Sequence, residues 1–497
     1  MMLRSTGPLC LLVSMAAVGT GACNAIFGVD DLVGGAAPVA SVGGGGGAGG
    51  VPDGGGDGVG GGGGTSLASW ARVFGDAEVQ LAHGVALDGA DAVVVVGAYE
   101  GLLDPSLPAA GMGRSDAFAI SLGHDDGTTR WTTAVGDAGT PENQVARSVV
   151  STPAGVSVAG SFQQSALVNG VGQNSNGAAD FFVWRLTPEG ELDRFTSFSS
   201  SGDIAVRAIE SEAEASFVGG QFAGQLDLAG SLYNAAGPND GFAARIGAQG
   251  DVSWAEILGG SGRAIVQAIA LSGPDVIVAG SFDGTMTVGG STAQSAGGED
   301  GFVAALGSGG ALRWLTTFGG TGPDRVEAMV IGGDGRALIT GSFSEQLGIP
   351  PNVQLESAGS TDIFLLSLDV ATGDVVTGEG FGGPGLDAAF AMALDDAGTI
   401  AIGGVASPGF SVEGRVVEGG GGQDALLLLL GGTAGAMPHV FGDADNQRIR
   451  ALAFDADGAL AIAGRMEGTM DIAHTTLVSQ GDLDAFVALL RELPAAR

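Results

Sequence analysis

The chain has 497 residues, of which 94 are Gly, and its 55 acidic residues outnumber its 19 basic residues to give a formal net charge of −36. Such an acidic chain is not expected to bind nucleic acid or an anionic membrane surface, because both require a positive protein surface. Its two Cys, Cys10 and Cys23, both lie near the N-terminus, so no disulfide is expected within the folded domain.

Residues 1–23 have the pattern of an export signal, with Arg4 followed by an apolar stretch at 9–18 that is too short to span a bilayer. The run Thr20-Gly21-Ala22-Cys23 resembles the lipobox of bacterial lipoproteins, although Thr20 stands where Leu is commonest. The resemblance implies that the Cys23 thiol is lipidated. It also implies a protein exported and anchored to the outer membrane or cell surface of a Gram-negative bacterium, and Asn24 agrees with outer-membrane sorting. The alternative is an ordinary signal peptide cut nearby, with Cys23 unmodified.

Residues 24–65 are predicted to form a flexible tether. From residue 33 onward this segment is almost entirely Gly, Ala, Val, Pro and Ser, a composition that cannot form a core. As a random coil it would have a reach of roughly 35–40 Å.

Residues 66–497 contain a repeat of 60 to 64 residues, which is best followed from the Asp that opens one of its strands. This Asp recurs at Asp116, Asp180, Asp240, Asp300, Asp362, Asp424 and Asp484. A Phe follows two residues later in every unit but one, where Leu426 takes its place. Each unit contains four short segments with strand periodicity, and no long helical pattern occurs.

The repeat predicts an all-β fold, a seven-bladed β-propeller with four antiparallel strands per blade. The first strand-like segment, which contains Trp70, precedes any complete unit, whereas the last unit lacks its fourth strand. We therefore expect the N-terminal strand to complete the last blade, because an open array would leave exposed sheet edges. The Gly that closes the second strand of each unit, such as Gly280, is expected to make room for an aromatic ring or to permit a bulge.

The repeat also resembles the bacterial β-propeller repeat called SBBP. The runs that carry the resemblance are Asp300-Gly301-Phe302-Val303, Trp314 through Gly320, and Ala279-Gly280-Ser281-Phe282. The resemblance extends over residues 66–497, with the second, third and sixth units more degenerate. It implies a propeller in an exported protein, and it implies no catalytic residues, since the family has no single known activity.

One constellation of side chains is a candidate ligand site. Directly before a small residue in the first strand of each unit stand His83, Arg147, Arg207, Gln267, Glu327, Phe390 and Arg450. Equivalent positions in seven blades would form a ring at the mouth of the central channel. Three Arg in this ring, with Arg263, Arg325 and Arg448 in adjoining loops, would form a positive patch for a carboxylate, a sulfate or an acidic glycan. The alternative is that these Arg neutralise Asp137, Asp203, Asp324 and Asp445 in the same loops.

Other patterns give weaker indications. The seven repeated Asp would either bind calcium or cap loops through backbone N–H groups, and one carboxylate per blade favours capping. Asp455-Ala456-Asp457-Gly458 and Asp395-Asp396-Ala397-Gly398 are interpreted as hairpin turns. The four His, at His83, His124, His439 and His474, lack metal-ligand spacing, and no nucleophile or phosphate-binding motif occurs.

These observations favour a monomeric, lipid-anchored envelope propeller that acts as a non-enzymatic binding or scaffold module, without cofactor or metal. Its partner would be a protein or glycan of the envelope, and it would contact the membrane through the lipid alone. The alternative is an exported lyase or hydrolase acting on acidic polysaccharide, with His83 and Glu327 as its only acid–base candidates.

Overall fold

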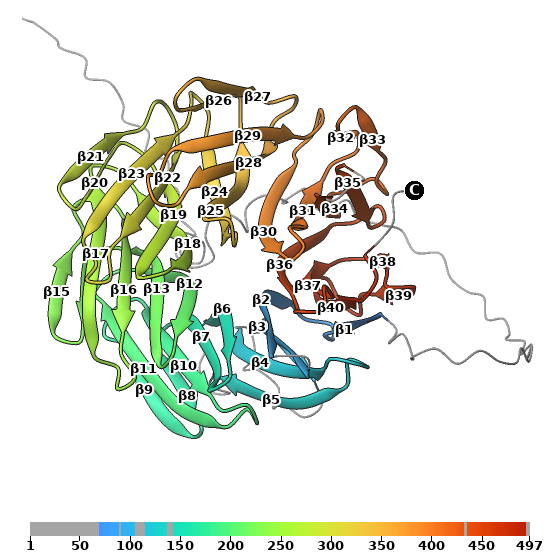
Figure 1. Ribbon diagram of the computed structural model, residues 1–497. Coiled ribbons are helices and arrows are strands. Elements are labelled where there is room, and N and C mark those ends of the chain that lie inside the picture. The colour runs from blue at the N-terminus through green and yellow to red at the C-terminus, as the bar shows by residue number, and fades with distance from the viewer. Residues whose placement is uncertain (1–68, 89–90, 105–114, 137–142, 432–434, 494–497) are drawn as a thin grey trace, which may run out of the picture. The chain divides into compact units, whose positions relative to one another are not determined.

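The computed structural model describes residues 69–88, 91–104, 115–136, 143–431 and 435–493, all of which belong to the unit Gly64–Arg497. Seven small antiparallel sheets stand around a central axis, so the predicted seven-bladed β-propeller is confirmed (Figure 1). Within the described residues no helix has the length and apolar character that a membrane span needs.

Each blade has four strands, which follow one another in the sheet from the axis outward. Blade 1 consists of β2 (Gln80–Asp88), β3 (Ala92–Tyr99), β4 (Asp116–Gly123) and β5 (Thr129–Val135). Blade 2 consists of β6 (Gln144–Thr152), β7 (Gly155–Phe162), β10 (Asp180–Leu186) and β11 (Leu192–Ser200). Blade 3 consists of β12 (Ile204–Glu212), β13 (Ala215–Phe222), β16 (Asp240–Ile246) and β17 (Val252–Gly260). Blade 4 consists of β18 (Ala264–Ser272), β19 (Asp275–Phe282), β22 (Asp300–Leu306) and β23 (Leu312–Phe318).

The remaining blades follow the same order. Blade 5 consists of β24 (Asp324–Ile331), β25 (Arg336–Phe343), β28 (Asp362–Asp369) and β29 (Val375–Phe381). Blade 6 consists of β30 (Ala388–Leu394), β31 (Ile400–Ala406), β34 (Asp424–Leu430) and β35 (Met437–Phe441). Blade 7 consists of β36 (Gln447–Phe454), β37 (Leu460–Met466), β40 (Asp484–Leu490) and β1 (Trp70–Phe74).

The ring is closed by the strand from the beginning of the domain. Strand β1 pairs antiparallel with β40, with Trp70 opposite Leu489 and Phe74 opposite Ala485. Figure 1 shows the blue β1 beside the red strands of blade 7. The prediction that the N-terminal strand completes the last blade is therefore confirmed.

The loops between the second and third strands contain hairpins that the sequence pattern did not predict. In the described residues these hairpins are β8–β9 (Ser165–Val168, Val171–Asn174), β14–β15 (Gln225–Leu228, Ser231–Asn234), β20–β21 (Thr285–Val288, Ser291–Gln294), β26–β27 (Gln346–Ile349, Val353–Glu356), β32–β33 (Phe410–Val412, Arg415–Val417) and β38–β39 (Thr469–Ile472, Thr475–Val478). Two of them continue the sheet of the preceding blade, because β14 pairs with β11 and β20 pairs with β17. The hairpins thus join neighbouring blades at their outer strands.

The hydrophobic core lies between the blades. The residue two positions after each repeated Asp is at most 1 % exposed in every blade, and burial of one such Phe contributes roughly 1.5–3 kcal/mol. The Trp residues of the outer strands add a second contact between blades. Trp314 packs on Gly373 of the next blade, and the φ of Gly373 is +77°. The Nε1–H of Trp314 donates to the carbonyl of Val370 at 2.9 Å.

Candidate functional site

The seven ring residues predicted from the sequence all occupy one structural position, a β-bulge in the innermost strand. Between β18 and β19, Val266 lies opposite Gly280 and Ala268 lies opposite Ala279, so Gln267 is an extra residue without a partner in the ladder. The same register shift falls at His83, Arg147, Arg207, Glu327, Phe390 and Arg450. A bulge re-aims the side chain of the extra residue, and the innermost strands stand nearest the axis (Figure 1).

The repeated register depends on the Gly of the second strand. A Cβ atom on Gly280 would lie 1.9 Å from the carbonyl oxygen of Ile265 and 3.0 Å from a ring carbon of Phe302. The Gly therefore accommodates both the bulged strand and the aromatic ring of the third strand. Both roles expected for this Gly, room for a ring and permission for a bulge, are confirmed.

Four of the ring residues bring positive or titratable groups together on consecutive blades. Burial lowers the pKa of His83 well below its ordinary value, and the charges of nearby guanidinium groups lower it further. These groups belong to Arg147, Arg450, Arg465 and Arg207. Arg207 lies two blades away from His83, and its charge contributes least of the four to lowering the His83 pKa. We call Arg147, Arg207 and Arg450, the three Arg of the ring, the cationic arc.

The remaining ring residues form a different surface. Gln267 donates a hydrogen bond from Nε2 to Oε2 of Glu327 at 3.1 Å, which joins blades 4 and 5. The guanidinium carbon of Arg450 lies 4.5 Å from the centre of the Phe390 ring, a cation–π distance that holds Arg450 beside blade 6. The ring is therefore polarised, with Arg on blades 7, 2 and 3, an imidazole on blade 1 and a carboxylate on blade 5.

The Arg residues predicted in the adjoining loops have other contacts. Arg325 forms an ion pair with Glu299 at 2.7 Å. Arg448 is buried and donates to Oε1 of Gln423 at 2.9 Å, and Arg263 is exposed at the surface.

One Asp of the neutralisation alternative, Asp324, has a backbone partner. The carboxylate of Asp324 accepts a hydrogen bond from the backbone N–H of Gly320 at 2.7 Å. Burial raises its pKa to about 7, so it does not supply a full negative charge near neutral pH. Asp137 lies outside the described residues.

Sequence reasoning missed Arg465, which stands directly after the Gly that closes the second strand of blade 7. It contributes to the positive potential at His83 although it is not a bulge residue. The repeat gave no signal for it, because the other blades have no basic residue at this position.

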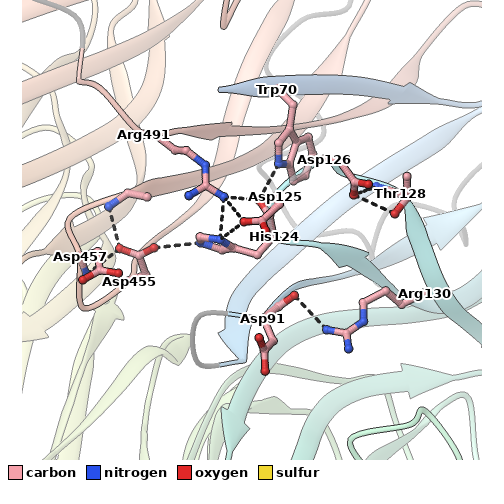
Figure 2. Close-up of polar contacts among 11 residues, drawn as sticks. Trp70, Asp91, His124, Asp125, Asp126, Thr128, Arg130, Asp455, Asp457 and Arg491 are labelled. Atoms are coloured by element: carbon pink, nitrogen blue, oxygen red, sulfur yellow. Dashed lines mark hydrogen bonds and ion pairs between the residues drawn. The ribbon is translucent and has the colours of Figure 1, made fainter. Parts of the chain in front are cut away.

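A second polar cluster, made of Trp70, His124, Asp125, Asp455 and Arg491, joins blade 7 to blade 1 (Figure 2). Nε2 of His124 lies 2.9 Å from Oδ2 of Asp455, and a guanidinium nitrogen of Arg491 lies 2.9 Å from Nδ1 of the same ring. Arg491 also pairs with Asp125 at 2.8 Å, and Trp70 donates to the carbonyl of His124 at 2.9 Å. The His124 and Asp455 side chains are 6 % and 4 % exposed, so the centre of this cluster is buried between the two blades that it joins, while Asp125 lies at its exposed edge.

Six of the seven repeated Asp cap the loops that precede them by accepting hydrogen bonds from backbone N–H groups: Asp180, Asp240, Asp300, Asp362, Asp424 and Asp484. Asp240 accepts hydrogen bonds from the N–H groups of Ala236 and Gly237, and Asp424 accepts one from Gly420 at 2.7 Å. The Asp395 and Asp455 segments are hairpin turns, as interpreted. In the described ranges, no group of three or more His, Cys, Asp and Glu side chains is arranged to hold a metal ion. Cys23 and the export signal lie outside the described residues.

No family model matches the chain, and no curated protein matches its sequence. Among solved structures, the chain is similar to BamB from Moraxella catarrhalis, with 9 % identity, a TM-score of 0.32, and coverage of 82 % of this chain and 85 % of that one. It is also similar to a europium-containing methanol dehydrogenase, with 8 % identity, a TM-score of 0.40, and coverage of 85 % and 93 %. A putative 6-phosphogluconolactonase from Bacteroides fragilis NCTC 9343 matches at 10 % identity, with a TM-score of 0.38 and coverage of 78 % and 93 %.

Proposed function

We propose that the propeller is a non-enzymatic binding module whose central channel holds an anionic group of its ligand. The observation that carries this proposal is that Arg147, Arg207 and Arg450 occupy the same bulge position in the innermost strands of blades 2, 3 and 7, which stand around one axis (Figure 1). Guanidinium groups bind carboxylate and sulfate through paired N–H donors, and partial burial strengthens these charge-assisted hydrogen bonds. The rest of this chain is strongly acidic, so the channel is an exception that a structural role alone does not require.

The setting that we propose is the bacterial envelope. The lipobox-like run ending at Cys23 and the Gly-rich tether support an exported, lipid-anchored protein of the outer membrane or cell surface. The SBBP-like repeat motifs support the same setting. The partner would then be a protein or glycan of the envelope that presents an acidic group to a monomeric propeller.

The test compares two triple variants with equal charge. R147A/R207A/R450A removes the Arg of the cationic arc, whereas R194A/R313A/R336A removes three Arg outside the ring. Both proteins and the wild type are screened on an array of carboxylated and sulfated glycans, and binding is quantified by calorimetry. We expect binding by the wild type and the outer variant and its loss in the arc variant. Equal binding by the two variants would refute the channel site.

The alternative is an exported lyase or hydrolase that cleaves acidic polysaccharide at the same channel. Its acid–base pair would have to be His83 and Glu327, and the Glu327 carboxylate already accepts a hydrogen bond from Gln267. Incubation of the protein with polygalacturonate distinguishes the two functions. Shortening of the chains, abolished in H83Q, would favour the enzyme, whereas binding without shortening supports the binding module.

A further inference from the structure

Two buried side-chain oxygens lie together where blade 7 meets blade 1. Nε2 of Gln80 donates to Oδ1 of Asp76 at 2.9 Å and to the carbonyl of Glu100 at 2.7 Å, so the orientation of the amide is determined and its Oε1 is an acceptor. That Oε1 and Oδ1 of Asp484 both lie within 2.4 Å of one point, the position that a Cβ atom on Gly75 would take. Neither oxygen has a hydrogen-bond donor among the described residues.

The same arrangement recurs where blade 6 meets blade 7. Nε2 of Gln447 donates to Oδ1 of Asp443 at 2.9 Å and to the carbonyl of Glu467 at 2.7 Å. Its Oε1 and Oδ1 of Asp424 lie within 2.3 Å of the Cβ position of Gly442, and both again lack a donor within the part of the chain that the structure describes. The two Gln and the two Asp are 0 % exposed. Two buried acceptors beside each other are unfavourable unless one of them carries a proton.

We propose that these two pairs form a proton-operated latch of the ring, in which Asp484 and Asp424 each carry a proton on Oδ1 and donate it to the Oε1 of the adjacent Gln. One proton satisfies both oxygens of a pair and needs no cavity. The other carboxyl oxygen, Oδ2, remains the acceptor for the N–H groups of Gln480 and Gly420 in the preceding loops. Loss of the proton places a negative charge beside a second acceptor at both junctions of blade 7, so the closure of the ring weakens.

The charged groups around Asp484 are consistent with this protonation. Burial raises the pKa of Asp484, and the charge of Asp76 in the loop after β1 raises it further. Strand β37 places Met466 opposite Asp484 and Arg465 opposite Ala485, and the pKa is raised although this Arg stands on the neighbouring strand.

Asp424 has comparable surroundings. Burial raises its pKa, and the charge of Asp443 raises it further. Strand β31 places Ala406 opposite Asp424, and the nearby Arg448 donates to Oε1 of Gln423. Because both pKa values lie above the ordinary value of 3.8, the folded state binds the two protons more tightly than the unfolded state. The stabilisation is complete below about pH 4 and is lost as the pH rises through the raised values.

The experiment replaces each acid with an analogue that cannot lose its donor. In D424N/D484N the Asn Nδ2–H can donate to the Gln oxygen at every pH, while the Asn oxygen keeps the loop N–H. Hydrogen–deuterium exchange of β1, compared with β22 of blade 4 in the same protein, measures the opening of the closure. We expect the relative protection of β1 in the wild type to fall between pH 5 and pH 8. In D424N/D484N it should stay constant, and at pH 8 it should be about tenfold greater than in the wild type, the effect of one hydrogen bond.

The matched control is the same substitution where the adjacent blade offers no acceptor. Asp240 has the equivalent position in blade 3, but the first residue of the next innermost strand is Ala264 instead of Gln. Its two carboxyl oxygens accept from the N–H groups of Ala236 and Gly237. D240N directs an amide N–H at one of these donors, so it should lower the urea midpoint at pH 8, whereas D424N/D484N should raise it.

The sign of the effect decides between a proton and any other occupant of the pairs. If D424N/D484N is destabilised like D240N or does not fold, the two carboxyl groups are ionised in the ring, as binding of a cation would require, and the latch is excluded. Relative protection of β1 that is constant or rises with pH in the wild type would also overturn it.

Discussion

Nε2 of His124 lies 2.9 Å from Oδ2 of Asp455, and this contact joins the first blade to the last. Arg491 donates to Nδ1 of the ring, so Nδ1 carries a lone pair and Nε2–H is the donor toward Asp455. Figure 2 shows that Arg491, from the end of β40, and His124, from the turn after β4, come from the two blades that meet at the closure. The closure therefore depends on a buried polar network as well as on the pairing of β1 with β40.

His124→Ala should lower the free energy of unfolding by about 2 kcal/mol, because it removes the donor to Oδ2 of the buried Asp455 carboxylate, while Oδ1 keeps the N–H groups of Asp457 and Ala459. Urea denaturation followed by Trp fluorescence measures the change. The matched control is His474→Asn, since His474 is exposed on a hairpin turn and its replacement should have little effect. Equal midpoints for the two variants would show that the network does not stabilise the closure.

The Trp residues allow a comparison in which only one hydrogen bond differs. Trp254 packs on Gly310 as Trp314 packs on Gly373, but Nε1 of Trp254 is buried without a hydrogen-bond partner. Trp314→Phe should therefore destabilise the protein by about 1 kcal/mol more than Trp254→Phe. Thermal and chemical denaturation of the two variants tests this difference, and a larger loss at Trp254 would contradict it.

Buried carboxyl groups predict how stability depends on pH. Burial raises the pKa of Asp324 to about 7 and that of Asp387 to about 6, from an ordinary value of 3.8. The folded state thus binds these protons more tightly than the unfolded state. The stabilisation is complete below about pH 4 and is lost as the pH rises through 6 and 7.

We therefore expect the urea midpoint to fall between pH 4 and pH 8. D324N/D387N should reduce that fall, because Asn keeps an acceptor for the N–H groups of Gly320 and Gly383 without ionising. Repulsion among the many other acidic groups also lowers stability as the pH rises, but the double variant hardly changes that repulsion. A smaller fall in the variant therefore reports the ionisation of Asp324 and Asp387. A midpoint that rises with pH, or an unaltered fall in the variant, would be inconsistent with ionisation of these two groups.

Glu210 is a carboxyl group at a position that is Val150 in blade 2 and Val330 in blade 5. Burial raises its pKa to about 7, and its ionisation therefore opposes folding at higher pH. Glu210→Val should stabilise the protein by roughly 1–3 kcal/mol at pH 8 and by much less at pH 4. Denaturation at the two pH values, with the exposed Glu214→Gln as control, measures the gain. A gain that is the same at both pH values would point to packing instead.

The closed ring could be predicted from the sequence because its signals are local and repeated. The Asp–Phe period defined the blades, and the unmatched segment at Trp70 with the missing last strand predicted the pairing of β1 with β40. The hairpins between the second and third strands were missed. Asn169-Gly170 has positive φ at both residues, as a two-residue hairpin turn requires, but Ala229-Gly230 adopts the same turn without a comparable sequence signal.

The candidate site could be predicted as a set of equivalent positions but not as a geometry. A β-bulge is a difference in register between two strands, so nothing within the strand of Gln267 alone reveals it. The distribution of charge around the ring depends on which blades become neighbours, and blade 7 becomes a neighbour of blade 1 only when the ring closes. His124 and Asp455 are 331 positions apart in the sequence, so their contact could not be predicted from a local pattern. The turn at Asp455 was predicted, but the hydrogen bond of its carboxylate to His124 was not.

The most direct test of the anion site is the position of a heavy anion in the crystal. Selenate has the shape and charge of sulfate, and its selenium atom is located by anomalous diffraction. We predict a selenium peak in the central channel within hydrogen-bond reach of Arg147, Arg207 and Arg450, and no such peak in R147A/R207A/R450A. A channel without selenium, with peaks only at surface Arg such as Arg313, would contradict the account.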